Sequence, residues 1–81
     1  MALAVLPLGF LAPGRVATVK DIIGGRNLRC RLTELGFVAG AKVRVFQNQP
    51  CGPVIVSLGD GRVAIGRGTA QKIMVEELSA S

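Results

Sequence analysis

Apolar and polar residues alternate along several short stretches of this chain, and glycine or proline separates most of them. The strand-like stretches are residues 15–23, 42–47, 54–58, 62–65 and 73–75. A two-residue period places successive side chains on opposite faces of a β-strand. Valine and isoleucine, which are frequent in these stretches, also favour strands. The pattern therefore predicts about five short strands, each with an apolar side.

The alternation assigns residues to an inner and an outer face of each expected strand. On the inner face we expect these aliphatic residues: Ala17, Val19, Ile23, Val43, Val45, Val54, Val56 and Leu58. In the first strand, Thr18 and Lys20 belong to the outer face. In the second, Lys42 and Arg44 point outward, and Phe46 shares their face. The second strand therefore presents one exposed aromatic ring beside two cations.

One segment has a helical period instead. Its leucines recur at i, i+4 and i+7: Leu28, Leu32 and Leu35. Such spacing puts all three on one face of a helix, and Asn27 can cap the first turn. Gly36 can adopt the left-handed conformation that ends a helix, with Phe37 packing back on Leu32. We expect one short helix, from about Asn27 to Leu35, inserted between the first two strands.

Glycine-rich segments mark the turns. Gly59-Asp60-Gly61 lies between two expected strands and predicts a hairpin. Asp-Gly favours a type I′ turn, in which both central residues have positive φ. Residues 66–72 are weakly helical at best. The sequence Gly66-Arg67-Gly68-Thr69 indicates a turn, because it lacks the Lys-Ser/Thr ending of a phosphate-binding loop.

The two ends of the chain differ from its middle. Residues 1–12 are uncharged and apolar, but Pro7 interrupts them and the first basic residue is Arg15. These features match neither a signal peptide nor a membrane-spanning helix. We expect this apolar arm to fold onto a single domain formed by residues 1–81. Residues 76–81 predict a flexible tail.

Composition and charge favour a small binding domain. A chain of 81 residues supports one core, and 49% of its residues are hydrophobic while only three, all Phe, are aromatic. The formal net charge is +5. Such a charge attracts acidic protein surfaces, nucleic acid or anionic lipid. It also serves solubility, which is the simplest explanation of any single arginine.

The residues needed for catalysis are scarce. The chain has no His, Tyr or Trp, and its five acidic residues include one adjacent pair, in the expected tail. Histidine is the commonest general base and metal ligand. Cys30 lies between Arg29 and Arg31, a setting that favours thiol reactivity, but no base or oxyanion site accompanies it. Cys30 and Cys51 are too few for a zinc site, and we expect free cytosolic thiols. The sequence therefore predicts no enzyme, no metal site and no cofactor.

Three blocks occur in order along nearly the whole chain. The first is residues 31–40, Arg-Leu-Thr-Glu-Leu-Gly-Phe-Val-Ala-Gly. The second is residues 52–56, Gly-Pro-Val-Ile-Val, and the third is residues 63–65, Val-Ala-Ile, followed by Ala70, Ile73 and Val75. Together they resemble the FeoA family, small cytoplasmic partners of the bacterial ferrous-iron transporter FeoB. Cys30 and Gly66 depart from the family, in which a basic residue is common at each position.

The resemblance implies a mainly β fold, an SH3-like barrel of about five strands with one inserted helix. It also implies a non-enzymatic, cytoplasmic protein that supports or regulates ferrous-iron uptake through FeoB. The basic residues available for such a partner form two groups. Those near the helix are Arg26, Arg29 and Arg31, and those on the second strand are Lys42 and Arg44, with Phe46.

Three alternatives stay open. A nucleic-acid-binding barrel would explain the net charge, although such barrels use more aromatic residues as stacking platforms. Iron-dependent repressors of the diphtheria-toxin-repressor type carry the same barrel as a C-terminal domain, but their winged helix has no counterpart in these 81 residues. A homo-oligomer would form through strand edges or the apolar arm, Met1 to Leu11.

Overall fold

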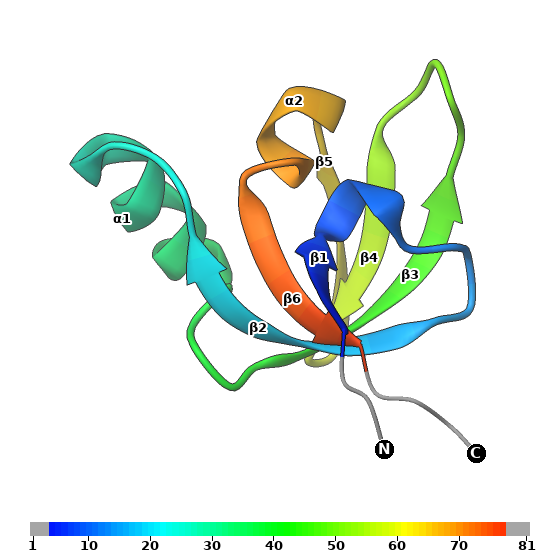
Figure 1. The fold of residues 1–81 in the computed structure, drawn as a ribbon, viewed down its shortest axis with the longest axis horizontal. Coiled ribbons are helices and arrows are strands. Elements are labelled where there is room, and N and C mark those ends of the chain that lie inside the picture. Colours follow the sequence, from blue (N-terminus) through cyan, green and yellow to red (C-terminus); the bar gives the residue numbers. More distant parts are fainter. Residues whose placement is uncertain (1–3, 78–81) are drawn as a thin grey trace.

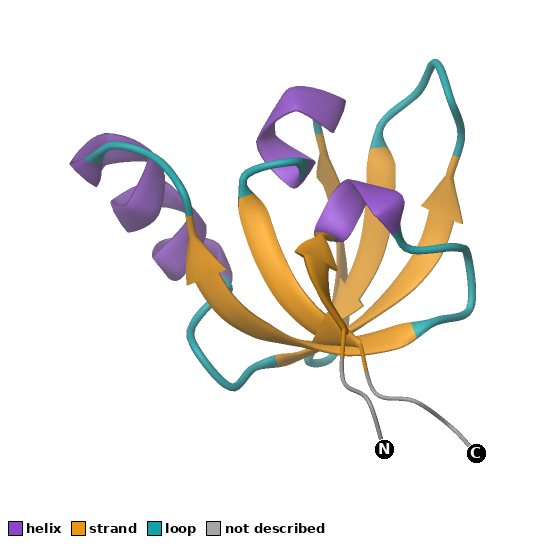
Figure 2. Cartoon of the chain, viewed as in Figure 1, coloured by secondary structure: helices purple, strands orange, loops and turns teal. Residues whose placement is uncertain are grey.

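The computed structural model describes residues 4–77 and contains six strands and three short helical segments (Figures 1 and 2). The strands are β1 (Ala4–Pro7), β2 (Val16–Ile22), β3 (Lys42–Asn48), β4 (Val54–Leu58), β5 (Gly61–Ile65) and β6 (Ile73–Glu77). The helical segments are the 3-10 turn η1 (Leu8–Phe10), α1 (Arg26–Leu35) and α2 (Arg67–Ala70). The mainly β fold class expected from the sequence is confirmed.

All six strands form one antiparallel sheet in the order β1-β6-β2-β3-β4-β5. The sheet curls around its own inner face, and α1 projects to one side of it (Figure 1). β6 lies between β1 and β2, so the first and last strands are neighbours. Within residues 4–77, no helix is long and apolar enough to span a membrane.

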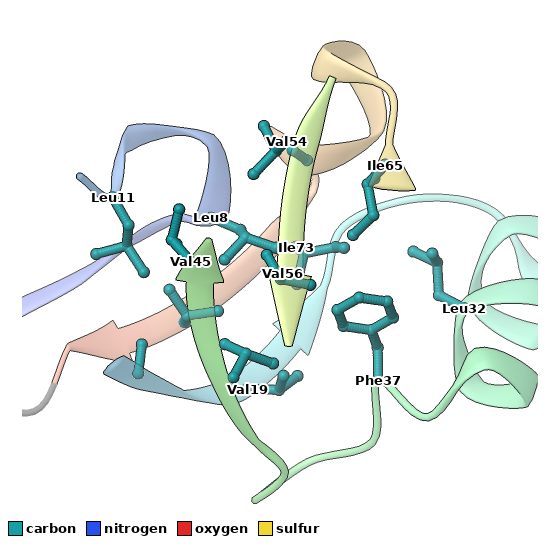
Figure 3. Packing of buried hydrophobic residues seen from close by; sticks show 14 of the residues in the cluster. Leu8, Leu11, Val19, Leu32, Phe37, Val45, Val54, Val56, Ile65 and Ile73 are labelled. Atoms are coloured by element: carbon teal, nitrogen blue, oxygen red, sulfur yellow. The ribbon is translucent and has the colours of Figure 1, made fainter. Parts of the chain in front are cut away.

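Aliphatic side chains fill the space inside the curled sheet (Figure 3). The buried core consists of Leu8, Leu11, Ala17, Val19, Ile22, Leu32, Phe37, Val43, Val45, Val54, Val56, Ile65, Ala70, Ile73 and Val75. Phe37 is the single buried aromatic residue of the described chain, and it lies between Leu32 of α1 and the sheet (Figure 3). The inner faces predicted for β3 and β4 are correct, with Leu58 only partly buried.

Burial of Ile23 was predicted, and that prediction is wrong. A register shift interrupts the pairing of β2 with β6 between Val19 and Asp21. An extra residue at such a bulge moves the following side chains to the opposite face. Ile22 therefore enters the core, and Ile23 is 56% exposed. Phe46 lies on the outer face of β3, as predicted, and is 49% exposed. A second register shift falls between its neighbours Val45 and Gln47.

The helix α1 ends as the sequence predicts. Gly36 has φ +111°, its amide donates to the carbonyl of Thr33, and the Phe37 amide donates to the carbonyl of Leu32. These two bonds define a Schellman motif, which satisfies the last carbonyls of a helix. The start differs, because Gly25 occupies the N-cap and Asn27 lies inside the first turn.

The predicted apolar face of α1 is also only partly correct. Leu32 is buried and Leu28 is partly buried, but Leu35 is 51% exposed. Leu35 occupies the last helical position, just before the chain turns back toward the sheet at Gly36. It reaches the sheet margin instead of the core.

The β4–β5 hairpin is present, but its turn is of a different type. Leu58 pairs with Gly61, so Gly59 and Asp60 are the two central residues. Gly59 has φ +64°, whereas no non-glycine residue of the described chain has positive φ. Positive φ at the first central position alone matches a type II′ turn and excludes type I′.

Residues 4–10 and 76–77 have regular structure that the sequence did not predict. Within the predicted apolar arm, residues 4–7 form β1, which pairs with β6, and residues 8–10 form η1. Within the predicted tail, Glu76 and Glu77 belong to β6 and pair with both β1 and β2. The arm therefore joins the sheet as a sixth strand. Residues 1–3 and 78–81 lie outside the described residues.

One polar side chain ties the N-terminal arm to the rest of the domain. Asn48, at the end of β3, donates from Nδ2 to the carbonyls of Gly9 at 2.9 Å and Leu11 at 2.7 Å. Its Oδ1 accepts a hydrogen bond from Arg67 of α2, which also donates to the carbonyl of Gln49. Asn48 therefore links three segments that are distant in sequence, and holds η1 over one end of the barrel.

Candidate partner-binding site

The ion pairs of the domain involve only part of its basic residues. Arg15 pairs with Glu77, Lys20 with Glu76 at 3.6 Å, and Arg29 with Asp21 at 3.3 Å. Three of the five acidic residues are thereby engaged. Of the six residues predicted to contact a partner, Arg29 alone has an ion pair in the described chain.

The helix group of predicted contact residues is dispersed. Arg29 also donates to the Ile22 carbonyl at 3.0 Å, so its side chain fastens α1 to the end of β2. Arg26 is exposed at the start of the helix. Arg31 lines a small groove of about 160 Å³ between α1 and the β5–α2 segment. These arginines therefore do not form one surface.

The strand group does form one surface. Lys42, Arg44 and Phe46 are all exposed on the outer face of β3. Arg44 pairs in register with Ser57 of β4, which pairs with Arg62 of β5, and the Arg62 guanidinium lies 3.8 Å from the centre of the Phe46 ring. We call Lys42, Arg44, Phe46 and Arg62 the basic strand face. A cation over an aromatic ring is a favourable contact that also orients the arginine.

Arg62 was not among the predicted site residues. The sequence does indicate which residue of β4 lies opposite Arg62. A two-residue hairpin turn at Gly59-Asp60 fixes the register of β4 and β5, and this register pairs Arg62 with Ser57. The contact with Phe46 has no comparable signal, since it joins side chains of β3 and β5 across the intervening strand β4.

An open groove lies beside the basic strand face. It has a volume of about 820 Å³ and runs between the end of α1, the start of β3 and the β4–β5 turn. Its lining consists of Val16, Leu35, Gly36, Ala41, Lys42, Val43, Arg44, Ser57, Leu58 and Gly59. Leu35 also lines the smaller groove that contains Arg31. The helix end thus separates two depressions.

These surfaces present apolar, cationic and thiol groups. The groove offers apolar contact area and the cations of Lys42 and Arg44. Cys30 and Cys51 are free and exposed. Among residues 4–77, no three His, Cys, Asp or Glu side chains gather where they could hold a metal ion.

Comparison with known proteins agrees with this architecture. The family model described as "FeoA domain" matches residues 6–77. The chain belongs to the FeoA family. A curated relative from Methanocaldococcus jannaschii, named "Putative Fe(2+) transport protein A", is 45% identical over 71 residues, which cover 88% of this chain and 85% of the relative. The family resemblance inferred from the three sequence blocks is therefore confirmed.

Solved structures of this family share the fold. A crystal structure of an iron uptake regulatory protein (FeoA) has a TM-score of 0.86 and 39% identity, and the match covers 94% of this chain and all of that one (100%). Stenotrophomonas maltophilia FeoA complexed with zinc, described as a procaryotic SH3 domain protein, has a TM-score of 0.74 and 29% identity over 93% of this chain and 89% of its own. The SH3-like fold is confirmed.

The fold extends beyond the FeoA proteins. A manganese-dependent transcriptional repressor has a TM-score of 0.84 at 21% identity, and the match covers 96% of this chain but 44% of the repressor. At that identity, the likeness concerns the fold alone.

Proposed function

We propose that this protein is a non-enzymatic adaptor or regulator of ferrous-iron uptake that binds the cytoplasmic side of a FeoB-type transporter. The observation that carries the proposal is the match of residues 6–77 to the FeoA domain. The 45% identical relative bears the name of an Fe(2+) transport protein. An accessory role also suits a small domain whose described surface offers cations and apolar area.

The basic strand face is the better supported contact surface for this partner. Its Lys42 and Arg44 have no carboxylate partner in the described part of the chain, whereas Arg29 is engaged with Asp21 and a main-chain carbonyl. Free charges on one face attract an oppositely charged partner and accelerate association. We therefore place the transporter's binding surface on an acidic region of its cytoplasmic part.

The decisive experiment measures binding to the transporter directly. The immobilised protein is exposed to the FeoB cytoplasmic domain and to full-length transporter in detergent, both at moderate salt. We expect binding to at least one of them, weakened in the double variant K42Q/R44Q and retained in K20Q/K72Q, which loses the same charge at two lysines outside the predicted contact residues. No detectable binding to either form of FeoB would refute the adaptor proposal.

Nucleic-acid binding is the competing function, and the exposed Phe46 between cations is the observation that favours it. Titration with single-stranded and duplex oligonucleotides over a salt series distinguishes this function from the adaptor function. Affinity that disappears at physiological salt reflects charge attraction alone. Affinity that persists there, together with absence of FeoB binding, would favour the nucleic-acid function.

The possible homo-oligomer has its own test. Light scattering in the same buffers measures the molecular mass of the protein in solution.

A further inference from the structure

The groove at the end of α1 combines an apolar lining with fixed walls. Five of its lining residues are aliphatic: Val16, Leu35, Ala41, Val43 and Leu58. Leu35 is 51% exposed, which leaves a large apolar side chain facing solvent. Exposed apolar area that is bordered by polar groups often marks an interaction site.

The Schellman motif at Gly36 holds one wall of this groove in place. A Cβ atom at Gly36 would lie 3.0 Å from Leu58 Cδ2, so the turn and β4 are in close contact. Phe37, the next residue, is anchored in the core with 1% exposure. The position of Leu35 relative to β3 and β4 is therefore set before any ligand arrives, which lowers the cost of ordering on binding.

The charge along the groove has one sign. Lys42 and Arg44 line it, and no acidic side chain of the described chain does. The ion pairs of the domain engage Asp21, Glu76 and Glu77 with other basic residues. The two cations of the groove are therefore available to carboxylates of a partner.

We propose that this groove binds an acidic protein segment in which an apolar side chain shares one face with carboxylates. The apolar side chain packs against Leu35 and Leu58, and the carboxylates pair with Lys42 and Arg44. Lys42 and Arg44 are two residues apart on β3, which corresponds to about 6.5–7 Å along a strand. Carboxylates at alternate positions of an extended segment have the same spacing.

The lining of the groove favours a protein segment over nucleic acid. No aromatic side chain lines it, since Phe37 is buried and Phe46 lies further along β3. Single-stranded nucleic acid binds small barrels largely by stacking on aromatic rings. A protein segment with an apolar side chain between carboxylates can contact both the aliphatic lining of the groove and its two cations.

The inference rests on the proposed function in one respect: in the cell, the segment would belong to the cytoplasmic part of the transporter. Its test does not need the transporter. The probe is the capped peptide Glu-Ser-Glu-Ser-Leu-Ser-Glu-Ser-Glu, which presents leucine and carboxylates on one face and reads the same in both directions. Control peptides replace leucine by serine, or every glutamate by glutamine.

The experiment is a titration of ¹⁵N-labelled protein with each peptide, followed by NMR at low salt. We expect shift changes at the amides of residues 35–36, 41–44 and 57–59. The variants L35S and K42Q/R44Q should each bind the probe about tenfold more weakly, the loss expected for one apolar anchor or two surface charge contacts. K20Q/K72Q, with the same net charge as K42Q/R44Q, should bind like the parent protein.

Each other outcome overturns the inference. Shift changes scattered over the surface, or equal weakening in K20Q/K72Q, would mean generic attraction to a cationic protein. Equal affinity for the serine control peptide would exclude the apolar anchor. An oligonucleotide that binds the same amides more tightly than the probe would assign the groove to nucleic acid.

The transporter assay then separates this inference from the proposed function. If FeoB binds and neither L35S nor K42Q/R44Q reduces its binding, the groove assignment fails while the adaptor function holds. If the peptide occupies the groove as expected and FeoB does not bind, the groove assignment holds and the adaptor function fails.

Discussion

Replacing Asn48 by alanine should weaken the attachment of the N-terminal arm to the end of the barrel. The amide side chain donates to the carbonyls of Gly9 and Leu11 and accepts from Arg67, so the variant loses three hydrogen bonds. Leu8, the first residue of the 3-10 turn, and Leu11, which follows the turn, are buried in the core and cannot move freely away. At about 1 kcal/mol for each lost bond, the free energy of unfolding should fall by roughly 2–4 kcal/mol.

Urea denaturation and thermal melting measure this change. For a domain of this size, a loss of about 2–4 kcal/mol lowers Tm by on the order of 10–20 °C. Amide hydrogen exchange should also accelerate at Leu11, whose N–H bonds to the Leu8 carbonyl in the same turn. N27A is the matched control, because Asn27 is exposed and makes no side-chain hydrogen bond in the described chain. It should alter stability by less than about 0.5 kcal/mol. A change equally small in N48A would refute the role assigned to Asn48.

Two further predictions concern Phe37 and the cysteines. F37A should lower the free energy of unfolding by about 3–5 kcal/mol, because it removes the buried ring between α1 and the sheet. Chemical denaturation measures this loss. A loss below about 1 kcal/mol would contradict the packing described. Cys30 and Cys51 are both free and exposed, so two thiols should react with Ellman's reagent in the native protein as they do in urea. Only one fast-reacting thiol, or none, would contradict this exposure.

Local patterns in the sequence were sufficient to predict much of the fold. The strand from Val54 to Leu58 has the bounds that alternation predicts, and the helix ends at Leu35 because the following glycine can adopt positive φ. The errors occur where distant parts of the chain decide the conformation. The bulge in β2 that turns Ile23 outward arises in its pairing with β6, some fifty residues later in the sequence.

The N-terminal arm shows the same limit. Its strand forms by pairing with β6, and its 3-10 turn is held by Asn48, which is separated from Gly9 by 39 positions and from Leu11 by 37. No local pattern indicates either contact. An uncharged, proline-interrupted segment of this kind therefore predicts association with a core but not the form that it takes.

One part of the candidate site could be predicted from local pattern and another part could not. The outward positions of Lys42, Arg44 and Phe46 follow from alternation in a single strand, and the structure has all three exposed. The groove was missed because helical periodicity assigned Leu35 to the core, whereas the turn at Gly36 leaves it at the sheet margin. Surfaces built from two elements depend on how these elements pack, which periodicity within one element does not describe.

The position of β6 between β1 and β2 has a consequence for how the domain folds. Within the described residues, β1 and β2 are joined to each other only through β6, which is made more than fifty residues after β2 begins. The sheet therefore cannot be completed during translation of the earlier segments. Such long-range pairing slows folding and leaves the edges of β1 and β2 unpaired until β6 has been made. We expect the sheet to close in one cooperative step once β6 is available to pair with both β1 and β2.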